Sequence, residues 1–519
     1  MALTYSDALS DAPHSPQCYR RLREIDVSLP NLHRAKCLGK GWQTVTLKFG
    51  TSGLRGLVSE LRGLPANTYT VAFLRMLQDR GALNQGSKVY VGRDLRASSP
   101  DIAQFVHAAI VKAGQIPVDC GALPTPALAL HASSENAPAI MVTGSHIPDD
   151  RNGLKFYRAD GEIDKRDESD IVEIHAAMGD AVSLPSPVDP VRLGPEPSRS
   201  YIDRFLSFFE KGSLSSLRVG VYQHSSVARD IIVDILRELG AETIALGRAE
   251  HFIPVDTEAL RQEDVALLKH WAAAEPFDAI VSTDGDGDRP LVADAGGMFV
   301  RGDLAGAITA HFLGADCVVT PVSSNSGLER CGYFAKVVRT RVGSPYVIEG
   351  IAAALAAGGK CVVGFEANGG VLLGSHVEKG GRTLPALRTR DSVLPILCML
   401  SAIAKTGRPL AEIAADFRFL AGASGRLEGV PTESSASFLG KLAADAAYAD
   451  KIFSVLGGIA NIDNRDGVRI TARNGEVVHF RASGNAPELR CYVEAKAESR
   501  ADELLGWGLA LGRAQILES

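Results

Sequence analysis

Three aspartates separated by single glycines follow an apolar segment near the middle of the chain. The segment from Phe277 to Thr283 is rich in apolar and β-branched residues and favours a buried strand, which ends directly at Asp284, Asp286 and Asp288. Side chains at i, i+2 and i+4 of an extended segment share one face, and the intervening glycines let the backbone curl so that three carboxylates converge. Carboxylate ligands without histidine or cysteine favour Mg²⁺ over Zn²⁺.

Three other interpretations apply to the same acidic segment. A calcium-binding EF-hand loop needs glycine at its sixth position and glutamate at its twelfth, where this chain has Arg289 and Ala295. The EF-hand is therefore disfavoured. The segment could instead hold the nucleophile of an aspartate-dependent phosphatase, or it could be a solvated acidic turn, and these two alternatives stay open at this point.

A serine at the end of another strand-like segment is a candidate nucleophile. Residues 139–142 favour a strand that opens into Thr143-Gly144-Ser145-His146-Ile147-Pro148. Ser145 lacks the G-x-S-x-G elbow of acyl hydrolases. Its neighbour His146 is also a candidate catalytic residue, although we expect adjacent side chains to diverge, which argues against a protease-like Ser-His pair. The alternative is that Ser145 is an ordinary turn residue.

A third segment suits the binding of an anion. Arg481 and Arg490 flank a Ser-Gly-Asn turn at residues 483–485, and a strand-like run follows from Cys491 to Glu494. Backbone N–H groups and a hydroxyl can converge on one anion in such a turn, and guanidinium groups bind phosphate through two parallel hydrogen bonds. The alternative is a polar hairpin turn with arginines on the surface.

Composition indicates a large enzyme without an electrostatic preference for polyanions. The chain has 519 residues and a net charge of −6, with acidic and basic residues interspersed, so neither a nucleic acid nor an anionic membrane is an expected partner. Its eight cysteines are scattered without a C-x-x-C pair, which favours reduced thiols. We find no membrane span or signal peptide and expect a cytoplasmic protein.

Alternating strand-like and helix-like segments predict an α/β protein with several domains. Strands are expected at residues 88–92, 139–142, 217–222, 317–320 and 361–363. Helices are expected from Ser99 as N-cap with Pro100 at N1, and from Ala228 to Leu239 before Gly240. Proline-rich and glycine-rich breaks divide the chain into an N-terminal extension, 1–45, and four domains, 46–190, 191–300, 301–420 and 421–519.

Five segments together resemble the α-D-phosphohexomutase superfamily of phosphomannomutases and phosphoglucomutases. They occur in the order found in that family, from about residue 47 to the C-terminus: Phe49–Gly56, Thr143–Pro148, Asp284–Arg289, Gly364–Gly370 and Arg481–Arg490. The resemblance implies three similar α/β domains and a smaller C-terminal sheet-and-helix domain around a central cleft. It also implies an isomerase that interconverts hexose 1-phosphate and hexose 6-phosphate.

The resemblance assigns roles to individual residues at the phosphoryl-transfer site. Ser145 would carry the transferable phosphoryl group, and an oxygen of that phosphoserine would join the three aspartates in binding Mg²⁺. Arg55 and Arg289 would neutralise charge near the transfer site. Lys155 matches a lysine proposed to help proton transfer.

Further residues would bind the substrate. Glu366 and Asn368 fall on the family's sugar-binding loop, and Gly343 falls on a second loop that faces the sugar. The loop that grips the non-reacting phosphate would include Arg481, Ser483, Gly484, Asn485 and Arg490. The expected ligands are Mg²⁺, a phosphorylated hexose and a hexose 1,6-bisphosphate that acts as intermediate and activator. Mannose phosphate is favoured over glucose phosphate by family likeness, and oligomeric state is not predicted.

Departures from the family pattern lie mainly in the sugar-binding loop. Relatives commonly have Glu-x-Ser-Gly-His there, whereas this chain has Asn368 in place of the serine and Gly370 in place of the histidine. A proton-transfer role for that histidine is therefore in doubt, and His376 is the nearest histidine in the sequence. A sugar phosphatase with an aspartate nucleophile and a weakly active sugar-phosphate binding protein remain alternatives.

Overall fold

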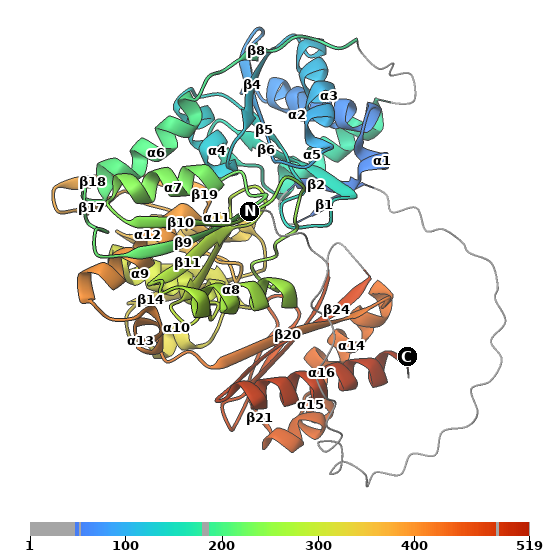
Figure 1. Cartoon of the computed structure of the whole chain (residues 1–519). Helices are drawn as coiled ribbons and strands as arrows, with labels where there is room; N and C mark the ends of the chain where they lie inside the picture. Colours follow the sequence, from blue (N-terminus) through green and yellow to red (C-terminus); the bar gives the residue numbers. More distant parts are fainter. Residues whose placement is uncertain (1–46, 51–52, 179–185, 484–486, 518–519) are drawn as a thin grey trace, which may run out of the picture. The chain divides into compact units, whose positions relative to one another are not determined.

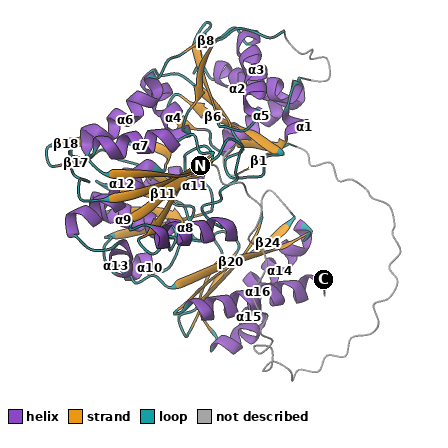
Figure 2. Cartoon of the chain, viewed as in Figure 1, coloured by secondary structure: helices purple, strands orange, loops and turns teal. Residues whose placement is uncertain are grey.

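The computed structural model describes residues 47–50, 53–178, 186–483 and 487–517 (Figure 1). These residues form four main sheets: a mixed eight-stranded sheet, a four-stranded sheet, and two five-stranded sheets, of which the last is antiparallel throughout. Helices alternate with strands along the chain (Figure 2). The predicted α/β class with four domains is confirmed. The expected N-terminal extension lies outside the described residues.

The first sheet has the order β1-β2-β6-β5-β3-β4-β8, with β7 paired to β6. Its strands are β1 (Lys48–Gly50), β2 (Gly53–Leu57), β3 (Lys88–Arg93), β4 (Ile116–Ala122), β5 (Ala139–Val142), β6 (Arg151–Arg158), β7 (Gly161–Glu162) and β8 (Val191–Arg192). Its helices are α1 (Val58–Leu61), α2 (Leu64–Asp79), α3 (Ser99–Lys112), α4 (Thr125–Ser134) and α5 (Lys165–Ala177). Because β8 pairs with β4, this sheet extends to Arg192, just past the expected boundary at 190.

The second sheet has the order β10-β9-β11-β12. Its strands are β9 (Arg218–His224), β10 (Glu242–Arg248), β11 (Ala279–Thr283) and β12 (Pro290–Asp294), and the associated helices are α6 (Glu196–Phe208), α7 (Arg229–Glu238) and α8 (Gln262–Ala274). Every residue of β11 is buried, as its continuous apolar sequence predicts for a central strand.

The third sheet has the order β14-β13-β15-β16-β19. Its strands are β13 (Cys317–Pro321), β14 (Lys336–Thr340), β15 (Val362–Phe365), β16 (Val371–Leu373) and β19 (Leu387–Asp391), and β17 (Val377–Lys379) pairs separately with β18 (Arg382–Leu384). The helices are α9 (Gly302–Leu313), α10 (Gly327–Arg330), α11 (Ser344–Ala356), α12 (Val393–Thr406) and α13 (Leu410–Ala415).

One connection recurs in these three sheets. A strand that pairs in parallel with its neighbour ends in a loop, and the next strand returns antiparallel to it: β5 to β6, β11 to β12, and β15 to β16. The three loops are residues 143–150, 284–289 and 366–370. They contain the candidate nucleophile, the three aspartates and the sugar-loop residues, respectively, so three chemical motifs occupy the same topological position.

The fourth sheet is antiparallel, with the order β20-β24-β23-β22-β21. Its strands are β20 (Ala421–Glu428), β21 (Ile459–Asp463), β22 (Val468–Ala472), β23 (Val477–Ala482) and β24 (Glu488–Ala495). The helices are α14 (Thr432–Ala444), α15 (Ala446–Phe453) with the short 3₁₀ turn η1 (Ser454–Leu456), and α16 (Glu498–Leu517), which packs against β20 and β24. This sheet and its helices have a hydrophobic core of their own.

One large hydrophobic core continues through the first three sheets, beside a smaller cluster in each of them. It includes Leu128 of α4, Phe205 of α6, Ile235 of α7, Ile308 of α9 and Leu397 of α12, each at most 2% exposed. Close packing across the sheets holds their strand ends in fixed positions, because a well-packed interior yields little. The loops at these ends are therefore carried on rigid supports.

The helix expected at Ser99 differs from the prediction by one residue. The N-cap is Ser98, so Ser99 and Pro100 occupy the first two helical positions. The Ser99 hydroxyl donates a hydrogen bond of 2.5 Å to Asp94 Oδ1 and is therefore not available for capping. The predicted strand at 139–142 is confirmed without change, and the other predicted strands begin or end within two residues of their expected limits.

Candidate active site

The candidate nucleophile Ser145 lies in the first turn after β5 and is fully buried. Its backbone has φ = 56°, a left-handed conformation that side-chain-bearing residues seldom adopt. The Thr143 hydroxyl accepts a hydrogen bond of 2.7 Å from the Ser145 backbone N–H and donates one of 2.7 Å to Asp94 Oδ2. These two bonds hold the serine in its strained conformation.

A buried arginine also holds the backbone of this loop through hydrogen bonds. Arg96 donates to the backbone oxygens of Pro148, Arg151, Ser145 and Ile147 at 2.5 to 3.1 Å, and its Nε donates to Asp94. Its guanidinium also stacks 3.9 Å from the ring centre of Phe252. A Cβ at Gly144 would lie 2.7 Å from this guanidinium, so glycine at that position leaves room for it.

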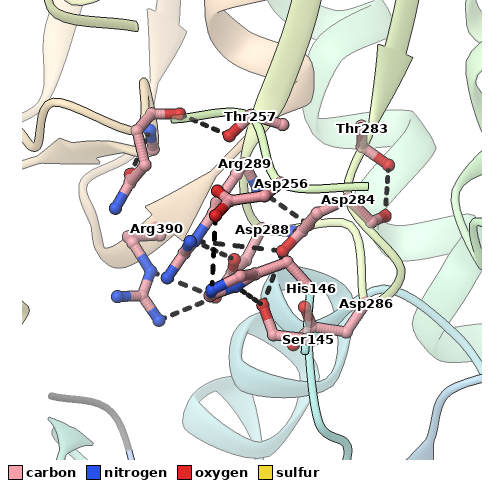
Figure 3. A network of polar contacts seen from close by, with 12 residues as sticks. Ser145, His146, Asp256, Thr257, Thr283, Asp284, Asp286, Asp288, Arg289 and Arg390 are labelled. Atoms are coloured by element: carbon pink, nitrogen blue, oxygen red, sulfur yellow. Dashed lines mark hydrogen bonds and ion pairs between the residues drawn. The ribbon is translucent and has the colours of Figure 1, made fainter. Parts of the chain in front are cut away.

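The three aspartates converge on the nucleophile loop. One oxygen from each of Asp284, Asp286 and Asp288 lies within 4.8 Å of the others, and all three side chains are buried. The Ser145 hydroxyl donates to Asp284 Oδ2 at 2.6 Å (Figure 3). Serine and aspartate are thus in contact although 139 residues separate them in the sequence. The predicted convergence of the carboxylates is confirmed.

The donor set of this cluster fits Mg²⁺. Asp286 Oδ1 and Asp288 Oδ1 are buried without a hydrogen-bond partner, which is costly for an acceptor unless a cation serves it. The donors are all oxygens, and the Ser145 oxygen adds a fourth beside Asp284. Burial, followed by repulsion from Asp286 and Asp288, raises the pKa of Asp284 well above its ordinary value, and a divalent cation would reverse that effect.

Basic residues surround the carboxylates. Lys155 Nζ, from β6, donates to Asp286 Oδ2 and to Asp288 Oδ2 at 2.6 Å each. Arg289 Nε lies 3.9 Å from Asp284 Oδ2 and 3.7 Å from Asp288 Oδ1. Burial and the nearby Arg289 lower the pKa of Arg55 to about 10, so this arginine still carries its charge at neutral pH. The three cations proposed for the transfer site therefore lie around the aspartates.

The expectation that Ser145 and His146 diverge is wrong. The Ser145 hydroxyl oxygen lies 3.4 Å from His146 Nδ1, because the left-handed turn at Ser145 brings the two side chains to the same side (Figure 3). His146 Nε2 lies 3.9 Å from Asp256 Oδ2. Burial, with Arg289 and Arg55 nearby, lowers the pKa of His146 well below its usual value, so the imidazole is neutral at pH 7.

Glu366 and Asn368 follow β15, and Glu366 is connected to the aspartate cluster through Arg390. Arg390 Nη1 donates to Glu366 Oε2 at 2.9 Å, while its Nε and Nη2 donate to Asp288 Oδ2 at 3.0 and 2.8 Å. The Thr257 hydroxyl donates to the Asn368 backbone oxygen at 2.9 Å. His376 lies elsewhere: it is exposed and follows Ser375, whose hydroxyl accepts from Val362 at the opposite end of β15.

The predicted phosphate loop lies between β23 and β24. Arg481 and Arg490 are directly opposite each other in the antiparallel ladder, and like charges in that arrangement repel unless an anion lies between them. Ser483 is buried and its backbone N–H donates to the oxygen of Glu488. Gly484 and Asn485 lie outside the described residues.

Gly343 is connected to the phosphate loop through one carboxylate. Asp466 Oδ2 accepts from the Val342 N–H at 2.8 Å, and its Oδ1 accepts from Arg481 Nε at 3.0 Å. Gly343 itself has φ = 131° at the start of α11, a conformation that favours glycine. The structure thus brings together the loop before α11 and an arginine of the fourth sheet.

Several site residues were missed from the sequence. Asp94 and Arg96 follow strand β3 and could have been found as an acid–base pair at a strand end, but nothing local links them to residue 145. Asp256, Thr257, Arg390 and Asp466 act through contacts made by tertiary folding. Arg390 had one weak signal: it lies next to Asp391, directly before the apolar helix α12.

Comparison with known proteins places the sequence in one family over most of its length. The phosphoglucomutase/phosphomannomutase α/β/α domains I, II and III match residues 46–180, 199–297 and 301–419, and the C-terminal domain of the same family matches residues 433–505. A phosphomannomutase of Sinorhizobium fredii (strain NBRC 101917 / NGR234) is 49% identical over 470 residues, covering 89% of this chain and 98% of the relative. A phosphomannomutase of Salmonella muenchen is 40% identical over 474 residues, covering 90% and 97%.

Solved structures share the fold at low sequence identity. A phosphoglucomutase/phosphomannomutase family protein from Burkholderia thailandensis has a TM-score of 0.70 at 18% identity, covering 89% of this chain and 97% of that one. An N-acetylphosphoglucosamine mutase from Aspergillus fumigatus, solved with GlcNAc-6P and magnesium, has a TM-score of 0.58 at 15% identity, covering 91% and 96%. A variant of the Aspergillus enzyme was solved with glucose 1,6-bisphosphate, with a TM-score of 0.54 at 14% identity, covering 92% and 97%.

The four-domain fold and the buried serine–aspartate site define the class of phosphohexose mutases, which are isomerases. With four matching domains and a relative at 49% identity across nearly its whole length, the chain belongs to the phosphoglucomutase/phosphomannomutase family. Among the described helices, none is both long and apolar enough to cross a bilayer.

Proposed function

We propose that the protein interconverts hexose 1-phosphate and hexose 6-phosphate through a phosphoserine at Ser145 and a bound hexose 1,6-bisphosphate. Mannose phosphates are the favoured substrates because the relatives at 49% and 40% identity are phosphomannomutases, and glucose phosphates are the second candidates. The observation that carries the proposal is the contact of the Ser145 hydroxyl with Asp284 in a buried cluster of carboxylates. This contact supports Ser145 as a nucleophile that acts beside a divalent cation.

The transfer step requires little beyond positioning and charge neutralisation. In the forward direction the O6 hydroxyl of hexose 1-phosphate attacks the phosphorus on Ser145, the Oγ–P bond breaks, and the hexose carries two phosphates. The bound bisphosphate then reorients in the site. The Ser145 oxygen attacks the phosphorus on O1 and the O1–P bond breaks, which leaves hexose 6-phosphate. Lys155, beside Asp286 and Asp288, is the proposed proton carrier for the sugar hydroxyl.

Positive charge in the cluster would stabilise the phosphoryl group during transfer. Mg²⁺, bound by the three aspartates and the phosphoserine, would supply a Lewis acid at the phosphoryl oxygens. Arg55 and Arg289 would balance the remaining negative charge on the equatorial oxygens. Because this part of the site is buried, their interaction with the phosphoryl group is stronger than it would be in water.

The non-reacting phosphate would bind at the β23–β24 turn. Arg481 and Arg490 face each other there, and Ser483 with Gly484 and Asn485 completes the proposed loop. Hexose 1-phosphate and hexose 6-phosphate would use this clamp in turn, in opposite orientations. Glu366, Asn368 and Gly343 would then contact the sugar between the two phosphate sites, and binding energy from the clamp would orient the reacting hydroxyl.

The phosphatase alternative is less compatible with the hydrogen bonds of the aspartates. Asp284 Oδ2 accepts from Ser145, and Asp284 Oδ1 accepts from the backbone N–H groups of Asp288 and Arg289 at 3.1 and 3.2 Å. Asp286 Oδ2 accepts from Lys155 and from the Thr125 hydroxyl at 2.7 Å. An attacking carboxylate needs an oxygen directed at the phosphorus. Both oxygens of Asp284 are occupied, whereas Asp286 keeps Oδ1 without a hydrogen-bond partner, the oxygen that we assign to the cation.

Intact mass spectrometry combined with product analysis tests the proposal. The purified protein should carry one phosphoryl group on Ser145 and should convert mannose 1-phosphate to mannose 6-phosphate after priming with the bisphosphate. Glucose 1-phosphate should react in parallel at a lower kcat/KM. Release of inorganic phosphate from mannose 1-phosphate by a protein whose Ser145 is unphosphorylated would support the phosphatase instead, and binding without turnover would support a sugar-phosphate binding protein.

A further inference from the structure

Arg390 joins two loops that the proposed function assigns to different tasks. It is the penultimate residue of β19, is 1% exposed, and donates to Asp288 of the aspartate loop and to Glu366 of the sugar loop. Figure 3 shows its guanidinium directed toward Asp288. Both carboxylates are themselves nearly inaccessible, with side-chain exposures of 1% and 6%. The guanidinium therefore fixes the distance between a proposed metal ligand and a proposed sugar ligand.

The space for Arg390 is provided by Gly370. A Cβ added at residue 370 would lie 2.7, 2.9 and 3.0 Å from Arg390 Cδ, Cγ and Cβ, which is too close without movement. The backbone at Gly370 is outside the left-handed region, so its lack of a side chain matters for space rather than for conformation. A side chain at 370 and an arginine at 390 thus compete for one volume.

We propose that Arg390 is the residue that positions Asp288 and Glu366 relative to each other, and that Gly370 is required because Arg390 is present. The inference rests on the proposed function, which assigns Asp288 to the metal and Glu366 to the sugar. Arg390 holds Glu366 through one of its oxygens, Oε2, and leaves Oε1 to accept from sugar hydroxyls. It holds Asp288 by Oδ2 and leaves Oδ1, which has no hydrogen-bond partner, to the cation.

The planar guanidinium is suited to this task in a way that lysine is not. Three N–H groups act at once: two on Asp288 and one on Glu366. A lysine ammonium is a single charge centre at the end of a flexible chain and would favour one carboxylate over the other. Removal of the charge leaves two buried carboxylates with one cationic partner fewer, which favours local rearrangement of both loops.

A double-mutant cycle on Gly370 and Arg390 tests the inference. The proteins are wild type, Gly370→Ala, Arg390→Ala and the double variant, with Arg390→Lys added to keep the charge. Arg388→Ala is the matched control, because Arg388 is on the same strand but exposed. Thermal unfolding shows which variants are folded. Calorimetry gives the Kd of mannose 6-phosphate for the metal-free protein, and a titration gives the Mg²⁺ concentration for half-maximal activity.

We expect Gly370→Ala and Arg390→Ala each to raise the Kd of mannose 6-phosphate and the required Mg²⁺ concentration at least fivefold. In the double variant the alanine at 370 should add nothing, because the side chain it displaces is gone. Arg390→Lys should restore either the Kd of mannose 6-phosphate or the Mg²⁺ concentration for half-maximal activity to near the wild-type value, but not both. Arg388→Ala should match wild type in both.

Two results would overturn the inference. The first is a Kd and a Mg²⁺ requirement within twofold of wild type in folded Arg390→Ala or Arg390→Lys. The second is a Gly370→Ala penalty that is equally large with and without Arg390, which would show that Gly370 serves another neighbour. Failure of the proposed function is separate, since it would appear as a wild-type protein that does not convert mannose 1-phosphate.

Discussion

At the scale of single residues, the site depends on the strained backbone conformation of Ser145. Ser145 has φ = 56° and is held in this conformation by two residues. The Thr143 hydroxyl accepts from the Ser145 N–H, and Arg96 donates to backbone oxygens from Ser145 to Arg151. Strain of this kind persists only where the surroundings impose it, and it directs the hydroxyl at Asp284. The loop thus presents the proposed nucleophile before any substrate binds.

Replacement of Ser145 by alanine tests the nucleophile. Ser145→Ala should leave thermal unfolding close to wild type, because alanine fills the same space, and should lower kcat for mannose 1-phosphate by several orders of magnitude, since the phosphoryl carrier is lost. Ser134→Ala, at the exposed end of α4, serves as the control. Conversion at a rate near wild type by a folded Ser145→Ala protein would refute the assignment.

The candidate residues at this scale were predictable to the extent that they lie in short motifs. Ser145, Asp284, Asp286 and Asp288 could be named from a strand followed by a glycine-containing loop, and the structure places them together. Arg390 and Asp466 could not, because the partners of their side chains are 15 to 124 positions away in the sequence. The contact of Ser145 with His146 was missed because a left-handed backbone at a serine has no signature in residue types.

At the scale of elements, the aspartate loop between β11 and β12 sets the metal preference. Activity should disappear in excess chelator and return with Mg²⁺, whereas Zn²⁺ should restore little, because all donors are oxygens and none is sulfur or imidazole. Asp286→Asn should raise the Mg²⁺ concentration needed for half-maximal activity at least tenfold. Asp294→Asn, at the far end of β12, is the control. Full activity after exhaustive chelation would contradict this assignment.

The turn between β23 and β24 should serve substrate binding rather than chemistry. Arg490→Ala should raise KM for both mannose 1-phosphate and mannose 6-phosphate by about ten- to a hundredfold, since a charge-assisted hydrogen bond contributes roughly 1.5 to 3 kcal/mol. Phosphorylation of Ser145 should survive. Arg426→Ala is the control for the loss of one positive charge, because Arg426 lies opposite Arg490 on the neighbouring strand and is exposed. Loss of Ser145 phosphorylation with unchanged KM would assign Arg490 to the transfer site.

Element types were predictable where the apolar pattern was unambiguous. The strand at 139–142 and the helix within residues 228–239 were found, because burial of one face leaves a regular pattern in the sequence. Their pairing was not predictable, since the sequence does not show that β5, β11 and β15 each return through an antiparallel neighbour. The start of α3 moved by one residue because a tertiary hydrogen bond uses the Ser99 hydroxyl.

At the scale of the described chain, hydrogen bonds between side chains connect elements of different domains. The Ser344 and Thr389 hydroxyls of the third domain donate to Glu162 on β7 at 2.7 and 2.8 Å. The Tyr201 hydroxyl on α6 donates to Asp391 at 2.6 Å. The Ser326 hydroxyl donates to Glu494 of the fourth sheet at 2.5 Å. Together with the continuous core, these contacts keep the loops of different domains within reach of each other.

Buried histidines should make the stability of the protein sensitive to acid. Burial lowers the pKa of His224 and of His479 to about 4, against about 6.5 in an unfolded chain. Between those values the unfolded state binds more protons, so the free energy of unfolding falls as pH decreases from about 6.5 to 4, by up to about 1.4 kcal/mol per pH unit for each histidine.

Thermal unfolding at pH 7.5, 6.0 and 5.0 checks this dependence. The melting temperature should fall with pH, and His479→Gln should flatten the slope, because glutamine can still donate to the Asp466 backbone oxygen but does not take up a proton. His251→Gln, at an exposed position, should leave the slope unchanged. A His479→Gln protein with the wild-type slope would show that this histidine does not contribute.

The repeated connection of the first three sheets gives each proposed chemical task its own strand pair. The proposed transfer loop joins β5 and β6, the proposed cation-binding loop joins β11 and β12, and the proposed sugar loop joins β15 and β16. The strand pairs are separate, and Arg390 links the aspartate loop to the sugar loop. The unusual Asn368 and Gly370 lie in the sugar loop alone, beside an intact serine and an intact aspartate triad. A change of hexose specificity would then require substitutions at only a few residues of the sugar loop and at one neighbour that compensates for them.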